Sequence, residues 1–246
     1  MTWATVIALF NKTHYAVQPW IDAGATVYMF DLLHDGYEQD GNVYRIKADL
    51  DPGASGWLAV ESAMRNAKGK RIGLAFPPCD GLTSSGARHF AGKALADPMF
   101  QQTAVRRATL AAETFERHGF AYFIENPKGR LSTLWRKPDH YWDPNDFGGY
   151  LPENDTHPEW PEYIAPRDAY PKGSGAWLGG GFVWPEKKPV PPEILERVTA
   201  SGRTIRGSRQ FMKLGGKSAK TKAIRNASPR GIFRAVFEAN GMEAQA

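Results

Sequence analysis

The sequence predicts an α/β fold, in which a doubly wound, mostly parallel sheet carries helices on both faces. Over the first half of the chain, short apolar runs rich in β-branched and aromatic residues alternate with longer helical segments. The chain has 246 residues, 42% of them hydrophobic, enough for one substantial core and a small appended lobe. After residue 135 the amino-acid composition changes and the strand and helix periods stop, which predicts an irregular insert added to this fold.

Five runs are expected to be strands: residues 5–10, 26–31, 44–48, 71–76 and 121–125. Helices are expected between them at residues 16–23, 56–67 and 101–118. The last helix carries apolar residues at three and four spacing and ends at His118-Gly119, a cationic last turn followed by glycine.

The segment 135–192 is rich in Pro, Gly, Trp, Tyr and Asp and sustains no strand or helix period, so an irregular insert is expected. Its rings would either stack on bases or form a satellite core, and they include Trp142, Trp160, Tyr163, Trp177 and Trp184. Residues 192–200 are expected to form a short helix. A second is expected at 228–240, with Ser228 as N-cap and Pro229 at the first helical position.

The domain organisation expected from these patterns has three parts. Residues 1–135 form the catalytic core, 136–200 the insert and a candidate substrate-recognition region, and 201–246 a basic segment that returns to the core.

Charge is unevenly distributed along the chain. Residues 201–237 contain ten Lys and Arg and no acidic residue, whereas residues 138–170 contain eight acidic residues and one arginine. The basic segment is a candidate surface for a polyanion, with a solvated basic face as the alternative.

Two observations exclude classes of protein. No apolar run approaches the length of a membrane span and the start lacks a secretory signal, so we expect a cytoplasmic protein without a membrane partner. The single cysteine, Cys79, excludes an internal disulfide and a thiolate-rich metal site, and we expect no metal.

Ligands of doubly wound sheets bind beyond the carboxyl ends of the strands, so residues that follow a strand are the candidate site. Pro77, Pro78 and Cys79 follow the fourth expected strand, and Glu125 ends the fifth. The two prolines restrict the backbone ahead of the cysteine and would expose its sulfur at a rigid turn, as a nucleophile requires. The alternative is an inert, buried thiol.

The run Phe-Pro-Pro-Cys79, followed by Thr83, Gly86 and Arg88, resembles the catalytic loop of the cytosine-C5 DNA methyltransferases, usually Pro-Cys-Gln-x-x-Ser-x-x-Gly-x-x-Arg. Glu125-Asn-Pro-Lys-Gly likewise resembles that family's Glu-Asn-Val segment. The likeness covers most of residues 1–135 and 225–240, and the Pro-Arg-Gly that begins at Pro229 resembles compact phage-type members.

The resemblance implies a fold like that of S-adenosylmethionine-dependent methyltransferases and a role in DNA modification, such as restriction-modification. Cys79 would add to carbon 6 of a cytosine flipped out of the duplex, and Glu125 would hold the ring at N3. Arg88 would contact a phosphate or the O2 face of the base. S-adenosylmethionine would supply the methyl group to carbon 5.

The cofactor half of the family pattern differs here. The family's first strand runs into Phe-x-Gly-x-Gly, whereas Phe10 is followed by no glycine before Gly24. The resemblance implies a cofactor site at Phe10, Asp31, Asp49 and Pro77, with Asp31 at the ribose hydroxyls and Asp49 at the adenine amino group. Both aspartates are equally well explained as ordinary turn residues.

DNA is the expected partner, with Arg203, Arg206, Arg209 and Lys213 as candidate phosphate contacts. Two alternatives stay open: the same Cys79 and Glu125 chemistry with another transferred group or a free nucleotide, and a catalytically silent DNA-binding protein. A zinc deaminase is excluded because its Pro-Cys-x-x-Cys motif needs a second cysteine.

Overall fold

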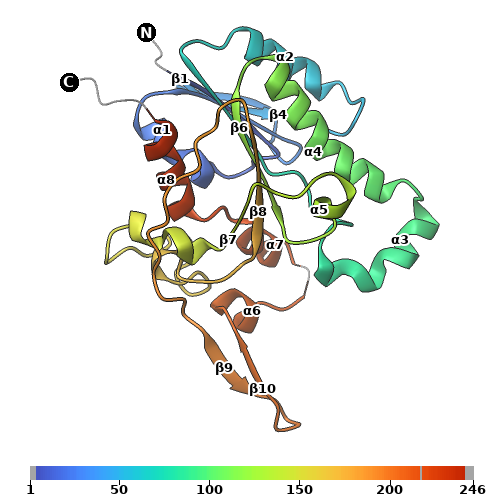
Figure 1. Cartoon of the computed structure of the whole chain (residues 1–246), viewed down its shortest axis with the longest axis vertical. Helices are drawn as coiled ribbons and strands as arrows, with labels where there is room; N and C mark the ends of the chain where they lie inside the picture. The colour runs from blue at the N-terminus through green and yellow to red at the C-terminus, as the bar shows by residue number, and fades with distance from the viewer. Residues whose placement is uncertain (1–3, 217, 242–246) are drawn as a thin grey trace. The chain divides into compact units, whose positions relative to one another are not determined.

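The computed structural model describes residues 4–216 and 218–241, with no side-chain description for residues 84–86 (Figure 1). The chain forms two compact units. Unit 1 comprises Met1–Trp142 and Gly173–Phe182, and unit 2 comprises Asp143–Lys172 and Val183–Ala246. Residues 136–200 therefore contribute to both units, and residues 201–246 belong to unit 2.

Unit 1 is built on an eight-stranded sheet in the order β3-β4-β2-β1-β5-β6-β8-β7. Its strands are β1 (Ala4–Leu9), β2 (Thr26–Asp31), β3 (Tyr37–Asp40), β4 (Val43–Lys47), β5 (Lys70–Ala75), β6 (Ala121–Pro127), β7 (His140–Trp142) and β8 (Ser174–Gly179). Neighbours from β4 through β2, β1 and β5 to β6 pair in parallel. β3 pairs antiparallel with β4, and β8 pairs antiparallel with both β6 and β7. The predicted α/β class with a mostly parallel sheet is confirmed.

All five predicted strands are present, within two residues of their expected ends. β3, β7 and β8 were not predicted. β3 has the sequence Tyr-Glu-Gln-Asp and is exposed throughout, so it carries no apolar alternation. β8 contains Ser174, Gly175, Ala176 and Gly179, small residues of low strand propensity, and it is held by its pairing with two neighbours. The segment 135–192 is therefore not wholly irregular, because it supplies two strands of the main sheet.

The helices of unit 1 are α1 (Gln18–Asp22), α2 (Gly56–Arg65), α3 (Phe90–Ala96), α4 (Phe100–Arg117) and α5 (Leu131–Leu134). Short 3-10 helices add His14–Ala16 and Ser84–His89. The helices predicted at 16–23, 56–67 and 101–118 correspond to α1, α2 and α4.

One buried cluster joins α2 and α4 to the sheet, and both helices lie along the same side of it in Figure 1. Trp57 and Val60 of α2 and Phe115 of α4 pack there with Ile7 and other strand residues. The ring of Phe115 lies so close to β5 that a Cβ on Gly73 would be 2.4 Å from it. α1 packs against β2 outside this cluster.

The elements of unit 2 are the 3-10 helices Pro144–Tyr150 and Pro166–Asp168, the strands β9 (Leu195–Val198) and β10 (Thr204–Gly207), and the helices α6 (Arg209–Lys213), α7 (Ala219–Asn226) and α8 (Arg230–Asn240). β9 and β10 form a separate two-stranded antiparallel sheet.

The helix predicted at 192–200 is wrong, because this segment contains β9. Pro191 and Pro192 supply no backbone N–H, and Val198 and Thr199 are β-branched, which favours an extended chain. Gly202, with φ +79°, then allows the chain to turn back into β10.

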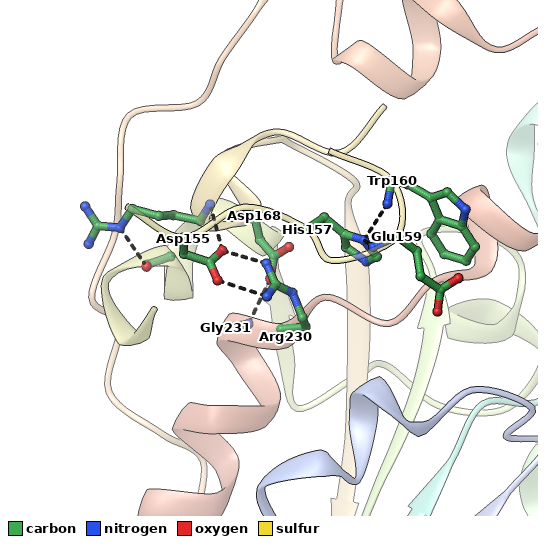
Figure 2. A network of polar contacts seen from close by, with 9 residues as sticks. Asp155, His157, Glu159, Trp160, Asp168, Arg230 and Gly231 are labelled. Carbon is green, nitrogen blue, oxygen red and sulfur yellow. Dashed lines mark hydrogen bonds and ion pairs between the residues drawn. The ribbon is translucent and has the colours of Figure 1, made fainter. Parts of the chain in front are cut away.

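Helix α8 also begins later than predicted. Pro229, not Ser228, is the N-cap, and no side chain of its own segment caps the helix. The Gly231 amide instead donates to the Asp168 carboxylate at 2.8 Å. Figure 2 shows the Arg230 guanidinium facing Asp155, to which it donates two hydrogen bonds of 2.9 and 2.5 Å. These contacts fasten the 143–172 segment of unit 2 to its C-terminal helix.

The rings of the predicted insert are largely core residues. Trp142 and Trp177 are fully buried in unit 1. In unit 2, Trp160 and Tyr163 pack against a small cluster that includes Ile164 and Ile224, and Trp184 lies edge-on to Phe147.

Candidate active site

The Cys79 loop leaves the sheet at the carboxyl end of β5. The Phe76 amide donates to the Leu9 carbonyl at 3.0 Å, which ties the start of the loop to the end of β1. The Cys79 carbonyl then accepts from the amides of Leu82 at 2.9 Å and Thr83 at 3.3 Å. Gly81 turns the chain with φ +90°. Cys79 is half-buried and opens this tight turn, whereas Pro77 behind it is buried.

The end of β6 and the segment that follows it are joined directly to this loop. The Asn126 side-chain amide donates to the Pro77 carbonyl at 2.9 Å, and the Arg130 amide donates to the Leu82 carbonyl at 2.7 Å. Thr83 and Gly129 also form an isolated antiparallel β-bridge. The loop that carries Cys79 and the strand end that carries Glu125 are therefore held side by side.

Gly129 is required at this junction. A Cβ at this position would lie 2.1 Å from the Leu82 carbonyl oxygen, so any larger residue would push the two segments apart. The sequence motif that begins at Glu125 thus has a packing reason for its last glycine.

Glu125 is oriented by Ser174, a residue that no motif in the sequence marks. The hydroxyl of Ser174, a fully buried residue of β8, donates to Glu125 Oε1 at 2.6 Å. This hydrogen bond restricts the rotamer of the glutamate. No local signal could have identified Ser174, because it reaches Glu125 through the antiparallel pairing of β6 with β8.

The side-chain carbonyl oxygen of Asn126, Oδ1, is a buried hydrogen-bond acceptor. Only 1% of the residue is exposed, its amide nitrogen is used by Pro77, and its Oδ1 has no hydrogen-bond partner among the described residues. A buried carbonyl oxygen without a donor is costly, so Asn126 Oδ1 is available to a hydrogen-bond donor that the described residues do not supply.

Arg88, the third predicted catalytic residue, is exposed on the 3-10 helix Ser84–His89. Its Nε donates to His89 Nε2 at 3.1 Å. The Arg88 guanidinium is therefore accessible from solvent, and its predicted contact with a phosphate or with the base stays a prediction.

The carboxyl ends of β1 and β2 form the second part of the candidate site. Phe10 adopts φ +54°, a left-handed conformation that is strained for an aromatic residue and that glycine would adopt freely. The next amide, Asn11, donates to the Phe30 carbonyl at 3.1 Å. Asn11 is 3% exposed, and its side-chain Oδ1 also has no hydrogen-bond partner among the described residues.

His34, which no motif in the sequence marks, completes this corner. It is buried, and its Nε2 lies 3.1 Å from the Asn11 carbonyl oxygen, to which the ring donates in its Nε2–H form. Burial lowers the pKa of His34, and the nearby Lys12 adds to this effect, so the ring is neutral at neutral pH.

The two predicted cofactor aspartates have different environments. Asp31 ends β2, accepts the Leu33 amide at 2.8 Å, and has its pKa raised because burial disfavours the charged form. Asp49 is exposed, and its carboxylate accepts the Asp51 amide at 2.9 Å, as an ordinary turn aspartate does.

The predicted phosphate contacts in unit 2 are partly used within the protein. Arg209 donates to both oxygens of Glu193, at 2.5 and 2.6 Å, and Arg206 pairs with Glu196 at 2.8 Å. Lys213 donates to the Glu162 carbonyl at 3.1 Å, whereas Arg203 is exposed on the hairpin. Arg209 thus has a structural role within unit 2, which its charge alone could not reveal.

Within residues 4–216 and 218–241, no cluster of three or more His, Cys, Asp and Glu side chains could hold a metal ion. No helix in the same part of the chain is long and apolar enough to cross a membrane. A scan of the sequence against models of protein families finds no match, and a search of curated proteins finds no related sequence.

Proposed function

We propose that this chain is a DNA cytosine-C5 methyltransferase with a fold like that of S-adenosylmethionine-dependent methyltransferases, in which Cys79 is the nucleophile and Glu125 holds the base. One observation carries the proposal. The Cys79 loop and the Glu125 strand end leave adjacent parallel strands and are joined through Asn126, Arg130 and the Thr83–Gly129 bridge. Both motifs of the family resemblance therefore meet at one place.

The residues have complementary chemical roles. Carbon 5 of cytosine is a poor nucleophile until the Cys79 thiolate adds to carbon 6 and moves electron density to carbon 5. Glu125 at N3 steadies the charge that this addition creates on the ring. Ser174 occupies Oε1 of Glu125, so the second carboxyl oxygen is the one that meets N3. After carbon 5 has accepted a methyl group, loss of the carbon-5 proton and of Cys79 restores the aromatic ring. The target base has to leave the stack first.

S-adenosylmethionine, when bound, supplies the methyl group. The ends of β1 and β2 fit such a molecule in chemistry: the unpartnered Oδ1 of buried Asn11 is an acceptor for an ammonium or hydroxyl group, and Asp31 offers a carboxylate to ribose hydroxyls. Pro77 and the left-handed backbone at Phe10 border the same strand ends. Asp49 has a turn partner, and we give it no role.

A second candidate keeps the Cys79 and Glu125 chemistry but transfers another group or acts on a free nucleotide. The observation that favours it is the corner formed by Asn11 and His34, which stands where the family has glycines. The side chains of Asn11 and His34 occupy space that glycines would leave open. This corner would therefore suit a group donor whose shape differs from that of S-adenosylmethionine.

The test is intact-protein mass spectrometry after incubation with S-adenosylmethionine and duplex DNA in which 5-fluorocytosine replaces cytosine. Fluorine at carbon 5 cannot be lost as a proton, so the covalent complex accumulates. Because Cys79 is the only cysteine, any thiol adduct is assigned without mapping. Cys79→Ser is the matched control.

A Cys79-dependent complex that carries one additional methyl group is the expected result. The same complex without the methyl mass would replace the proposal by the second candidate. Absence of an adduct on DNA and on free nucleotides would leave only the catalytically silent DNA-binding alternative.

A further inference from the structure

The β9–β10 hairpin is an exposed, basic element of unit 2. It contains Arg197, Arg203 and Arg206 against the single acidic residue Glu196. Among the described residues, β9 and β10 pair only with each other. Nearly all of its side chains are exposed or half-buried, so it contributes little to the core.

The pairing of the strands sorts these arginines onto two faces. Ile205 lies opposite Arg197, and the Thr199 amide and hydroxyl both bond the backbone of Arg203, so Arg197 and Arg203 share one face. Arg206 lies opposite Glu196 on the other face and pairs with it at 2.8 Å. Among the described residues, no ion pair involves Arg197 or Arg203. One face therefore carries two unneutralised guanidinium groups and no acid.

The base of the hairpin is held firmly. Arg209 bonds both oxygens of Glu193 and donates to the Pro161 carbonyl at 2.8 Å, which ties the two ends of the hairpin to the 143–172 segment of unit 2. The ring of Phe211 in α6 packs over Gly207, where a Cβ would lie 2.3 Å from it. An isolated two-stranded hairpin is marginal in water, so these anchors give it a defined orientation.

We propose that this hairpin enters the major groove of duplex DNA and presents Arg197 and Arg203 to the base edges. The inference deepens the proposed function, since it names the form of nucleic acid and the element that reads it. The major groove of B-DNA, about 12 Å wide, admits a two-stranded β-ribbon, and arginine is the side chain that most often reads guanine there.

The composition of the hairpin argues against other nucleic acids. Residues 195–207 contain no Phe, Tyr or Trp, and proteins that bind single strands rely on such rings to stack the bases. The major groove of double-stranded RNA is too deep and narrow for side chains to read. Duplex DNA is the polyanion that suits a rigid, ring-free, arginine-bearing ribbon.

The experiment compares the full-length chain with the variant Arg197→Gln/Arg203→Gln. The probes are a fluorescein-labelled DNA duplex with a randomised central region, the corresponding single strand, and an RNA duplex of the same length. Binding is measured by fluorescence anisotropy, and the bound fraction of the DNA pool is sequenced. The control is Arg65→Gln/Arg117→Gln, which removes two equal charges from α2 and α4 of unit 1.

The wild-type chain is expected to prefer the DNA duplex and to enrich particular base pairs. The hairpin variant should lose duplex affinity by about tenfold or more per arginine and lose the enriched guanines, whereas the control variant should do neither. Equal loss in both variants would mean a general charge effect and would overturn the inference. So would a wild-type preference for the single strand or the RNA duplex.

The outcome is separable from that of the proposed function. Cys79→Ser leaves the hairpin intact and should bind and select DNA like the wild type. Duplex selection that depends on the hairpin, without a Cys79 adduct, would refute the methyltransferase proposal and leave the groove-reading role in place.

Discussion

A single added methyl group tests the close contact between the Cys79 loop and the segment that follows Glu125. In the variant Gly129→Ala the new Cβ would lie 2.1 Å from the Leu82 carbonyl oxygen. An ordinary carbon–oxygen contact needs about 3.3 Å, so the two segments have to separate by roughly 1.2 Å. The 2.7 Å hydrogen bond from the Arg130 amide to the same oxygen, and the β-bridge to Thr83, would then break.

The expected cost follows from these contacts. Losing a backbone hydrogen bond at a poorly solvated junction costs about 1–3 kcal/mol, which corresponds to a fall in melting temperature of roughly 2–12 °C for a chain of this size. Displacing a catalytic group by about 1 Å can cost on the order of 100-fold in rate. Thermal unfolding followed by circular dichroism measures the first effect, and the rate of Cys79 adduct formation measures the second.

Gly92→Ala is the matched control, because a Cβ at Gly92 on α3 would meet nothing within 4 Å. It should leave both quantities unchanged or raise the stability slightly. If Gly129→Ala melts and reacts like Gly92→Ala, the two segments are not held in the arrangement described, and the main support for the proposed function is lost.

Three further predictions concern the two units separately. Ser174→Ala removes the hydrogen bond to Glu125 and should slow adduct formation by about 10- to 100-fold with DNA affinity unchanged; an unaltered rate would remove Ser174 from the site. Asn11→Ala should weaken binding of S-adenosylmethionine by about tenfold in equilibrium dialysis, and equal binding would place the cofactor elsewhere. In urea titrations between pH 4 and 6.5, Asp168→Asn should become more stable as the pH rises and His157→Gln less stable, whereas the wild type should change little.

The signs of the pH prediction follow from two opposite pKa shifts in the network of Figure 2. Burial raises the pKa of Asp168 from 3.8 to about 6, so the folded chain holds a proton that the unfolded chain releases, and the free energy of unfolding falls as the pH rises through this range. Burial, with the nearby Arg230, lowers the pKa of His157 from 6.5 to about 4, which has the opposite effect over nearly the same range. Each variant removes one of the two opposing contributions to the pH dependence of the free energy of unfolding. Parallel pH profiles for the two variants would contradict this assignment.

Asn is the suitable replacement at Asp168 for a structural reason. Asp168 has φ +49°, and asparagine is one of the few residues that tolerate a left-handed backbone. Its side-chain carbonyl can still accept the Gly231 amide that begins α8. The substitution therefore removes the titration with little change in the contacts.

Local pattern was sufficient wherever one element could be recognised by its own residues. The five parallel strands are apolar runs bounded by turn residues, and α4 has its apolar residues on one side, so both were predicted within about two residues. The position of Cys79 and Glu125 at strand ends followed from the same pattern. Glycine and proline also helped to predict the turns, because the freedom of glycine and the fixed φ of proline act on the local backbone.

The misassigned segment at 192–200 shows where local pattern fails. Its apolar spacing suits a helix, but pairing with residues 204–207 makes it a strand. That partner lies beyond the turn at Gly202, outside the range of a local helical pattern. β8 was missed for a related reason, because its small residues carry no period and its stability comes from two neighbouring strands.

The sequence by itself determined the α/β class and the positions along the chain of the five parallel strands and the helices between them. It also determined the two motifs that carry the candidate chemistry. Only the tertiary structure decided that Ser174 bonds Glu125, that Arg209 is used by Glu193, and that Asp168 caps α8. The physical reason is the same in each case. Period and propensity depend on neighbouring residues, whereas a hydrogen bond between residues 16 to 63 positions apart depends on the path of the whole chain between them.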